Sequence, residues 1–536
     1  MDGSGSGKSA SYSIPNAFQC LGSYVFTDPK GELYDKTAGY LKSQGYDIKV
    51  LNLVNPANSD GYNPLMHISS EIDVDVVANT IVKGQKAESG SDPYWDDMAE
   101  MLLKALIYYL MATRPEEEQN LASCSELVRA ANSNGGNNLL TELMNQLPYD
   151  HPARMNYKSI EIAPEKTYGS ILSSLQSKLG KFDSKDIAEV TSTDTINFDD
   201  IGSKKTAVYV ISSDTHKAYD FLLTIFFSQM IQQLYNFADE NGGRLKVPTY
   251  FILDEFANIG QIPDFDKKIS TSRSRGISFS VILQNLDQLE AVYEKSYETI
   301  MGNCDTHVFL GSNSFKTVEY FSKALGEKTV FRDSKSINRD KHYHKQGLSE
   351  SDQSVARALM TPDELRRMDN DLCIIFEKGL KPVKARKYYY FEKPMARKLQ
   401  EHTLNHLEFD VGVRGKWRKY NPYNPYVDEN DKNQPKKDLK VESLDDLFED
   451  TPSDAKNNVQ PQVKTQAPQE KAENNINNNM SNNTNMQQSK MQESEPVILP
   501  QGDEENDDEL FTIDVQKEIE AKFDELFGDV TEDNKN

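Results

Sequence analysis

The first segment able to do chemistry is a run of glycine and serine that ends in lysine and serine. Residues 3–9 read GSGSGKS. Glycines let backbone N–H groups wrap phosphate oxygens, a lysine reaches the terminal phosphates, and a serine hydroxyl binds the metal ion. This pattern predicts a phosphate loop for ATP and Mg²⁺, with Ser9 as a metal ligand. The nucleotide-binding residues would be Gly3, Ser4, Gly5, Ser6, Gly7, Lys8 and Ser9.

The beginning of this run departs from the full pattern. GxxxxGKS places its first glycine at position 2, where the sequence has Asp2, and the strand that normally precedes such a loop is absent because the sequence starts at Met1. A flexible glycine- and serine-rich terminus is the alternative interpretation. If the loop is genuine, we expect the chain to be cut inside its nucleotide site.

A pair of carboxylates follows a strongly apolar run much later in the sequence. Residues 250–255 read YFILDE, which predicts a buried strand that delivers Asp254 and Glu255 at its carboxyl end. In phosphoryl transfer an aspartate orients Mg²⁺ and a glutamate polarises the attacking water. We therefore expect Asp254 as the second metal ligand and Glu255 as a catalytic residue. An ordinary strand followed by an acidic turn would read the same way.

Three further polar residues are candidates for the reaction. Gln284 ends the apolar run ISFSVILQN, where an amide can sense the terminal phosphate, although strand-end glutamines also occur without a function. Arg273 and Arg275 lie in STSRSRGIS just before that run. Arginine suits the stabilisation of phosphoryl charge on a neighbouring subunit. A solvated turn is the equally weighted alternative for these two arginines.

Strands must carry these side chains to one edge of a sheet. Apolar runs indicate the strands, and segments of helical period lie between them, including residues 10–19 and 216–237. Such alternation predicts an α/β fold with a parallel sheet. The predicted strands are residues 23–27, 47–53, 206–211, 249–253, 277–283 and 306–310, with later strands at 371–376 and 387–391.

The middle of the first half has a different character, because helical periodicity dominates it. The segment WDDMAEMLLKALIYYLMA at 95–112 is an example. We therefore predict an all-α domain inserted into the nucleotide-binding domain, which also explains the distance from Lys8 to Asp254. The predicted domains are 1–74, the all-α insertion 75–195, the second nucleotide-binding part 196–420, and a tail 421–536.

The tail carries most of the negative charge. The whole chain has a net charge of −24, of which −17 lies in residues 421–536. Asparagine, glutamine, proline and acidic residues predict disorder there. The tail repeats an acidic pair followed by Leu-Phe, which we interpret as a docking motif for a partner, with coincidence as the alternative. The motif occurs as DDLF at 445–448 and as DELF at 508–511 and 524–527.

The remaining composition points to a chain in a reducing compartment. The four cysteines have no metal-ligand spacing, and no apolar run approaches the roughly 18 residues of a membrane span. We therefore expect the chain as written to be soluble and cytoplasmic. The body outside the tail has a net charge of only −7, so local basic faces are possible.

In this order the segments resemble the TraG/TraD-type coupling proteins of type IV secretion systems. The strings DPKGE and LDEFANIG are specific, because unrelated phosphate-loop proteins do not carry both. The resemblance covers about residues 3–400. The segments that carry it are GSGSGKS at 3–9, residues 25–53, YNPL at 62–65, YFILDEFANIGQIPDF at 250–265, residues 272–289 and RALMTPDELRRM at 357–368.

The resemblance implies a RecA-like P-loop motor domain carrying an all-α domain, in a homo-hexameric ring with ATP between subunits. The motor would recruit DNA or a relaxase–DNA substrate and translocate it to a type IV secretion channel during conjugation. Its partners would be single-stranded DNA bound without sequence preference, the relaxosome and channel proteins. Members usually have a membrane segment before the loop, at the cytoplasmic face of the cell membrane.

Two other functions stay open. One is a translocase of duplex DNA of the FtsK/HerA kind, and the other is a catalytically silent recruitment protein, which the altered start of the loop favours. For DNA contact, three basic clusters are candidates, and we expect two of them to be solvated faces. The clusters are Arg332, Lys335, Arg339, Lys341 and Lys345; Lys381, Lys384, Arg386 and Lys387; and Arg414, Lys416, Arg418 and Lys419 around Trp417.

Overall fold

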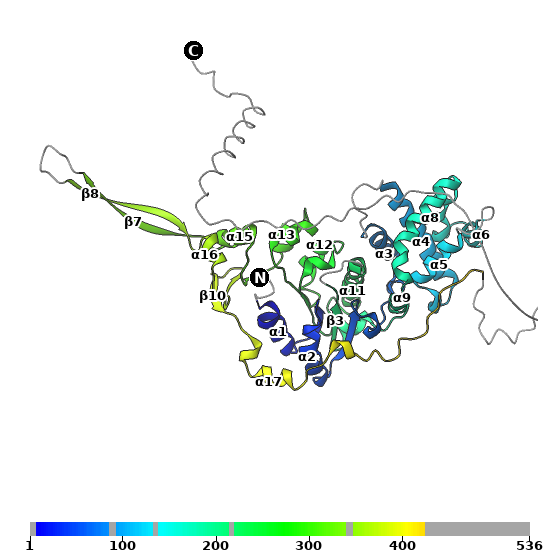
Figure 1. Cartoon of the computed structure of the whole chain (residues 1–536), viewed down its shortest axis with the longest axis horizontal. Helices are drawn as coiled ribbons and strands as arrows, with labels where there is room; N and C mark the ends of the chain where they lie inside the picture. Colours follow the sequence, from blue (N-terminus) through cyan, green and yellow to red (C-terminus); the bar gives the residue numbers. More distant parts are fainter. Residues whose placement is uncertain (1–6, 85–92, 132–137, 214–218, 339–346, 424–536) are drawn as a thin grey trace, which may run out of the picture. The chain divides into compact units, whose positions relative to one another are not determined.

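The computed structural model describes residues 7–84, 93–131, 138–213, 219–338 and 347–423, with side chains for all of these except 331–353. Its centre is a five-stranded sheet of order β2-β3-β1-β4-β5, and every pairing in it is parallel (Figure 1). The predicted α/β class with a parallel sheet is confirmed. Its strands are β1 (Ser23–Thr27), β2 (Asp47–Asn52), β3 (Thr206–Ile211), β4 (Thr249–Leu253) and β5 (Ile277–Val281).

The sheet is buried at its centre, which explains the continuous apolar runs of these strands. Every residue of β1 and β3 is buried. Phe26 stacks on Tyr209 with ring centroids 4.9 Å apart, and the long helix α11 (Asp220–Glu240) is buried along most of its length. The other helices around the sheet are α1 (Ile14–Phe18), α2 (Glu32–Ser43), α12 (Phe265–Thr271), α13 (Leu286–Val292) and α14 (Tyr297–Gly302).

Only helices lie between β2 and β3 in the residues described there. α4 is apolar on most sides, and it packs against α3, α7 and α8 (Figure 1). The extent of the predicted insertion as a separate domain stays a prediction. The helices are α3 (Glu71–Lys83), α4 (Pro93–Thr113), α5 (Leu121–Ala131), α6 (Leu139–Asn145), α7 (Pro152–Glu161), α8 (Glu165–Leu179), α9 (Lys185–Ser192) and α10 (Phe198–Ser203).

Two expectations for the later strands were wrong. The predicted strand 306–310 is β6 (Thr306–Phe309), but it is largely exposed and pairs antiparallel with β9 (Leu372–Glu377) in a separate sheet of order β10-β9-β6. The predicted strand 387–391 is β10 (Val383–Arg386), earlier in the chain. The polar stretch with the first basic cluster holds a hairpin of β7 (Glu327–Asn338) and β8 (Gly347–Ala358), between α15 (Phe315–Leu325) and α16 (Pro362–Arg366).

After α17 (Met395–Gln400), residues 401–423 run along the surface with one short 3-10 helix at His406–Glu408, and we call this segment the strap. It first contacts α2, where the N–H of Leu404 donates to Asp35 O at 2.9 Å and the N–H of His406 donates to Asp35 Oδ1 at 2.7 Å. Arg414 then donates to the carbonyls of Pro56, Ala57 and Ser59. The strap therefore holds the loop after β2.

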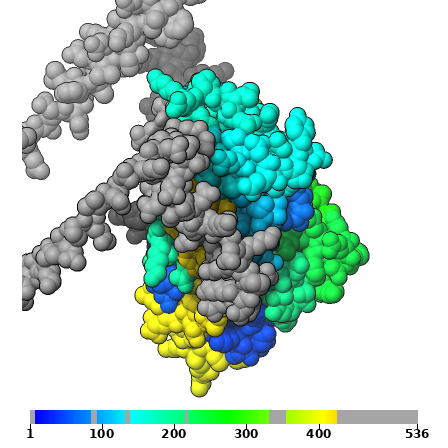
Figure 2. Space-filling model, turned by 90° about the vertical axis from the view of Figure 1, so that its right-hand side faces the viewer, coloured from blue at the N-terminus to red at the C-terminus, as the bar shows by residue number. Residues whose placement is uncertain are grey.

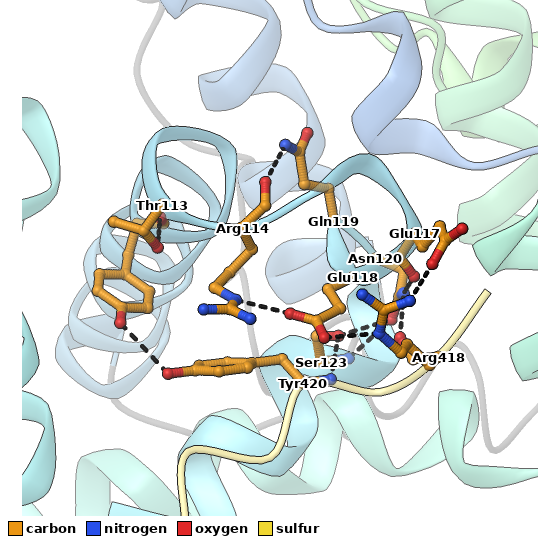
Figure 3. Close-up of polar contacts among 10 residues, drawn as sticks. Thr113, Arg114, Glu117, Glu118, Gln119, Asn120, Ser123, Arg418 and Tyr420 are labelled. Carbon is orange, nitrogen blue, oxygen red and sulfur yellow. Dashed lines mark hydrogen bonds and ion pairs between the residues drawn. The ribbon is translucent and has the colours of Figure 1, made fainter. Parts of the chain in front are cut away.

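The strap ends on the helical region. Arg418 pairs with Glu117 and Glu118, Arg114 lies over the ring of Tyr420, and the N–H of Tyr420 donates to Ser123 Oγ (Figure 3). In Figure 2 the cyan surface of this helical region lies above the yellow surface of residues near 400. Two arginines of the third basic cluster are therefore bound within the chain, and the expectation that this cluster faces DNA or solvent was wrong for Arg414 and Arg418.

Within the described residues, none of the helices combines the length and the apolar character needed to cross a bilayer. The acidic tail with its Leu-Phe motifs lies outside the described residues, as do Arg339, Lys341 and Lys345 of the first basic cluster.

Candidate active site

Several of the predicted site residues meet at the carboxyl edge of the parallel sheet. Asp254 and Glu255 follow β4, and Gln284 follows β5 by three residues. Because neighbouring parallel strands end at the same edge, these residues lie close together. Gly7, Lys8 and Ser9 reach the same edge from a π-helical turn at Ser9–Ser13 that leads into α1. Gly3, Ser4, Gly5 and Ser6 lie outside the described residues.

Two direct contacts join the phosphate-loop residues to the acidic pair. Lys8 Nζ lies 2.9 Å from Glu255 Oε1, and both side chains are mostly buried. Ser9 Oγ donates to Asp254 Oδ2 at 3.1 Å. Residues about 245 positions apart in the sequence are thus brought into one polar cluster.

Glu255 is held in place from two sides. Gln284 Nε2 donates to Glu255 Oε1 at 2.9 Å, the same oxygen that Lys8 contacts. The backbone of Glu255 is left-handed, with φ of 51°. This conformation costs a residue with a Cβ about 1–2 kcal/mol, so the surrounding contacts must enforce it. The result is a carboxylate aimed at the loop that carries Lys8.

Asp254 is partly buried at the end of β4. Burial raises its pKa, and the nearby charge of Lys8 only partly offsets this effect. Its Oδ1 accepts the N–H of Glu255 at 3.0 Å, and its carbonyl accepts the hydroxyl of Thr27 at 2.6 Å. A hydroxyl and a carboxylate oxygen within hydrogen-bond distance are hard donors of the kind Mg²⁺ prefers. Ser9 and Asp254 therefore fit the expected metal ion.

The two arginines do not join this cluster. Both precede β5 and so lie toward the opposite edge of the sheet from Asp254. Arg275 donates from Nε and Nη2 to Asp239 at 3.0 Å each, and its guanidinium lies 4.7 Å from the ring centre of Tyr235. Arg273 is 94% exposed, with Asp305 at 3.9 Å. A role for either on a neighbouring subunit stays a prediction, and exposure favours Arg273.

Sequence reasoning missed two residues of this site. Thr27 ends β1 and fixes the carbonyl of Asp254, and Tyr12 shares a hydrogen bond of 2.8 Å with Ser280 of β5, which holds the loop helix against the sheet. Thr27 could have been suspected, because it is the last residue of the strand before DPKGE. No signal in the sequence marks Tyr12.

Asp28 of the DPKGE string is a helix-positioning residue. It is buried, and its Oδ2 accepts the N–H of Tyr34 in the first turn of α2 at 2.8 Å. Burial raises the pKa of Asp28 to about 6, and the hydrogen bond from Tyr34 offsets only part of that effect. Between pH 4 and 6 the native state therefore holds a proton that the unfolded chain has released, so this group's contribution to stability falls as the pH rises.

We expect Asp28→Asn to raise the free energy of unfolding above pH 6. An amide oxygen still accepts the N–H of Tyr34 but carries no charge to bury, and a shift of about two pKa units corresponds to about 3 kcal/mol. The gain should shrink as the pH falls toward 4. Urea unfolding of both proteins at several pH values measures it, and a difference that does not change with pH would contradict this account.

Comparison with known proteins gives the family. Residues 1–412 match the family described as type IV secretory system conjugative DNA transfer. The chain is 27% identical over 391 residues to conjugal transfer protein TraG of Escherichia coli, covering 68% of this chain and 60% of that protein. It is 25% identical over 415 residues to VirD4 of Rhizobium rhizogenes, covering 74% and 58%. The chain thus spans about three fifths of these relatives.

Solved structures of the conjugative coupling protein TrwB are also similar. The unbound form aligns with a TM-score of 0.47 at 16% identity, covering 71% of this chain and 88% of that one. A TrwB structure in complex with ADP and Mg²⁺ aligns with a TM-score of 0.47 at 15% identity, covering 70% and 86%. With the family match extending over residues 1–412, the chain belongs to the type IV secretory system conjugative DNA-transfer family.

Proposed function

We propose that this chain is the ATP-driven motor part of a conjugative coupling protein. In this proposal it recruits DNA or a relaxase–DNA substrate and moves it toward a type IV secretion channel, acting as a homo-hexameric ring. The observation that carries the proposal is the convergence of Lys8, Ser9, Asp254, Glu255 and Gln284 at one sheet edge. The nucleotides bound in TrwB structures support a nucleotide at the same kind of site.

The chemistry of the site follows from these contacts. Lys8 neutralises Glu255 in the structure, and an incoming phosphate would compete for its amine. Glu255, freed from Lys8 but still held by Gln284, can then accept a hydrogen bond from the attacking water. Ser9 and Asp254 would hold Mg²⁺, which supplies charge neutralisation for the phosphates. Through its hydrogen bond, Gln284 thus connects the carboxylate of Glu255 to the segment that follows β5.

Hydrolysis of Mg²⁺-ATP by the purified chain, with and without single-stranded DNA, tests the proposal. We expect DNA to stimulate turnover and Lys8→Ala to lower it by at least about a hundredfold, because the amine that stabilises phosphoryl charge is lost. Lys30→Ala is a control, since it removes a lysine from the DPKGE string without touching the acidic pair. Turnover equal in Lys8→Ala and the unmodified chain would contradict the motor proposal, and no turnover in any form would favour the recruitment protein.

A further inference from the structure

An aromatic segment outside the predicted site contacts the phosphate loop. A Cβ added at Gly7 would lie 2.8 Å from Cε1 of Tyr389, so the edge of this ring packs directly on the loop backbone. Gly7 also has φ of +70°, which favours glycine for a second reason. Tyr389 comes from the segment after β10, far from the loop in sequence. It therefore forms part of the wall beside Lys8.

A second aromatic ring stacks on Tyr389. Phe391 stacks on Tyr389 with ring centroids 5.0 Å apart and an angle of 19° between the planes. Phe391 is 57% exposed, and Tyr390 packs edge-on against it at 5.6 Å. We call Tyr389 and Phe391 the aromatic pair. Phe391 thus presents an accessible aromatic face that Tyr389 and Tyr390 hold in place. Only the ring of Tyr389 lies between this face and the phosphate loop.

We infer that the aromatic pair stacks the purine base of the nucleotide whose phosphates bind at Lys8. The inference rests on the proposed function and deepens it. The base of a nucleotide is joined to its phosphates through the ribose, so a ring that stacks on the base must lie close to the phosphate loop. The contact of Tyr389 with Gly7 meets that condition. Ring stacking stabilises any base, because every base has a π face. The pair should therefore discriminate little between ATP and GTP.

The test separates the base from the phosphates. Dissociation constants for ATP and for inorganic tripolyphosphate, which has no base, are measured by calorimetry on the full chain and on Tyr389→Ala and Phe391→Ala. We expect each variant to bind ATP about tenfold more weakly, as for the loss of one stacking ring. Tripolyphosphate should bind all forms alike. Tyr389→Phe keeps the ring and should restore ATP affinity.

Tyr388→Ala is the matched control. Tyr388 is exposed in the same run, but its ring lies under Lys393 Nζ, 4.9 Å away, and outside the aromatic pair. Equal weakening of ATP and tripolyphosphate would overturn the inference, because the rings would then only support the loop. Unchanged ATP affinity with weaker single-stranded DNA binding would overturn it in favour of a DNA contact. If Lys8→Ala also binds ATP normally, the proposed function fails together with the inference.

Discussion

Glu255→Gln should lower ATP hydrolysis by at least about a hundredfold while ATP still binds. The glutamine has the same shape but cannot attract the proton of the attacking water, and the loss of a positioned base typically costs about 10²–10⁴ in rate. Binding should be kept or tightened, because Lys8 loses the carboxylate that it contacts at 2.9 Å and is free for phosphate. The measurements are steady-state hydrolysis and the dissociation constant for ATP.

A control glutamate distinguishes this effect from a general change of charge. Glu294 is exposed just after α13, and Glu294→Gln removes the same charge from the chain. It should hydrolyse ATP like the unmodified chain. Loss of ATP binding in Glu255→Gln would show that Glu255 supports the fold of the site, and normal turnover would show that another residue orients the water.

Glu118→Ala should release the strap from the helical region and lower the free energy of unfolding by about 3 kcal/mol. The Glu118 side chain is 1% exposed and is shared by Arg114 Nε at 2.6 Å and Arg418 Nε at 2.8 Å (Figure 3). Its removal takes the shared buried carboxylate away from both guanidinium groups, although Arg418 keeps its ion pair with Glu117. Breaking such a buried pair is costly. Urea unfolding measures the loss of stability, and hydrogen exchange of residues 414–423 measures the release of the strap.

Glu116→Ala is the matched change, because Glu116 is exposed in the same turn. It should leave both measurements unchanged. Combining Glu118→Ala with Arg418→Ala should cost less than the sum of the two single changes, since the two residues share one interaction. An additive result would mean that Glu118 stabilises the helical region without the strap.

The strands that a local sequence pattern marks could be predicted. The strands 23–27, 206–211 and 249–253 match β1, β3 and β4, because a strand buried on both faces is a continuous apolar run. The edge strands β2 and β5 also lie within the predicted 47–53 and 277–283, but the edge strand β10 of the second sheet was harder to place. β10 reads Val-Lys-Ala-Arg and is mostly exposed, so its position is decided by pairing with β9 and leaves little pattern in the sequence.

The same distinction holds for the candidate site. Lys8, Ser9, Asp254, Glu255 and Gln284 belong to short motifs, and the structure brings them together although their individual roles stay predictions. Tyr389 reaches Gly7 only through the path of the chain after β10, which no local pattern encodes. The contacts of Arg414 and Arg418 within the chain could not be predicted either. A basic residue in a polar segment gives the same sequence pattern whether its side chain faces water or contacts other parts of the chain.

The path of the strap has a mechanical consequence. Its contacts follow one another along the chain, from Asp35 through the loop after β2 to Glu118 and finally to Ala130, whose carbonyl accepts the hydroxyl of Tyr423. Tension applied beyond Tyr423 would load the hydrogen bond of Tyr423 first. The contacts of the strap would then break one after another, from Ala130 back toward Asp35. Because the contacts are loaded one at a time, each opens at the force that it alone withstands.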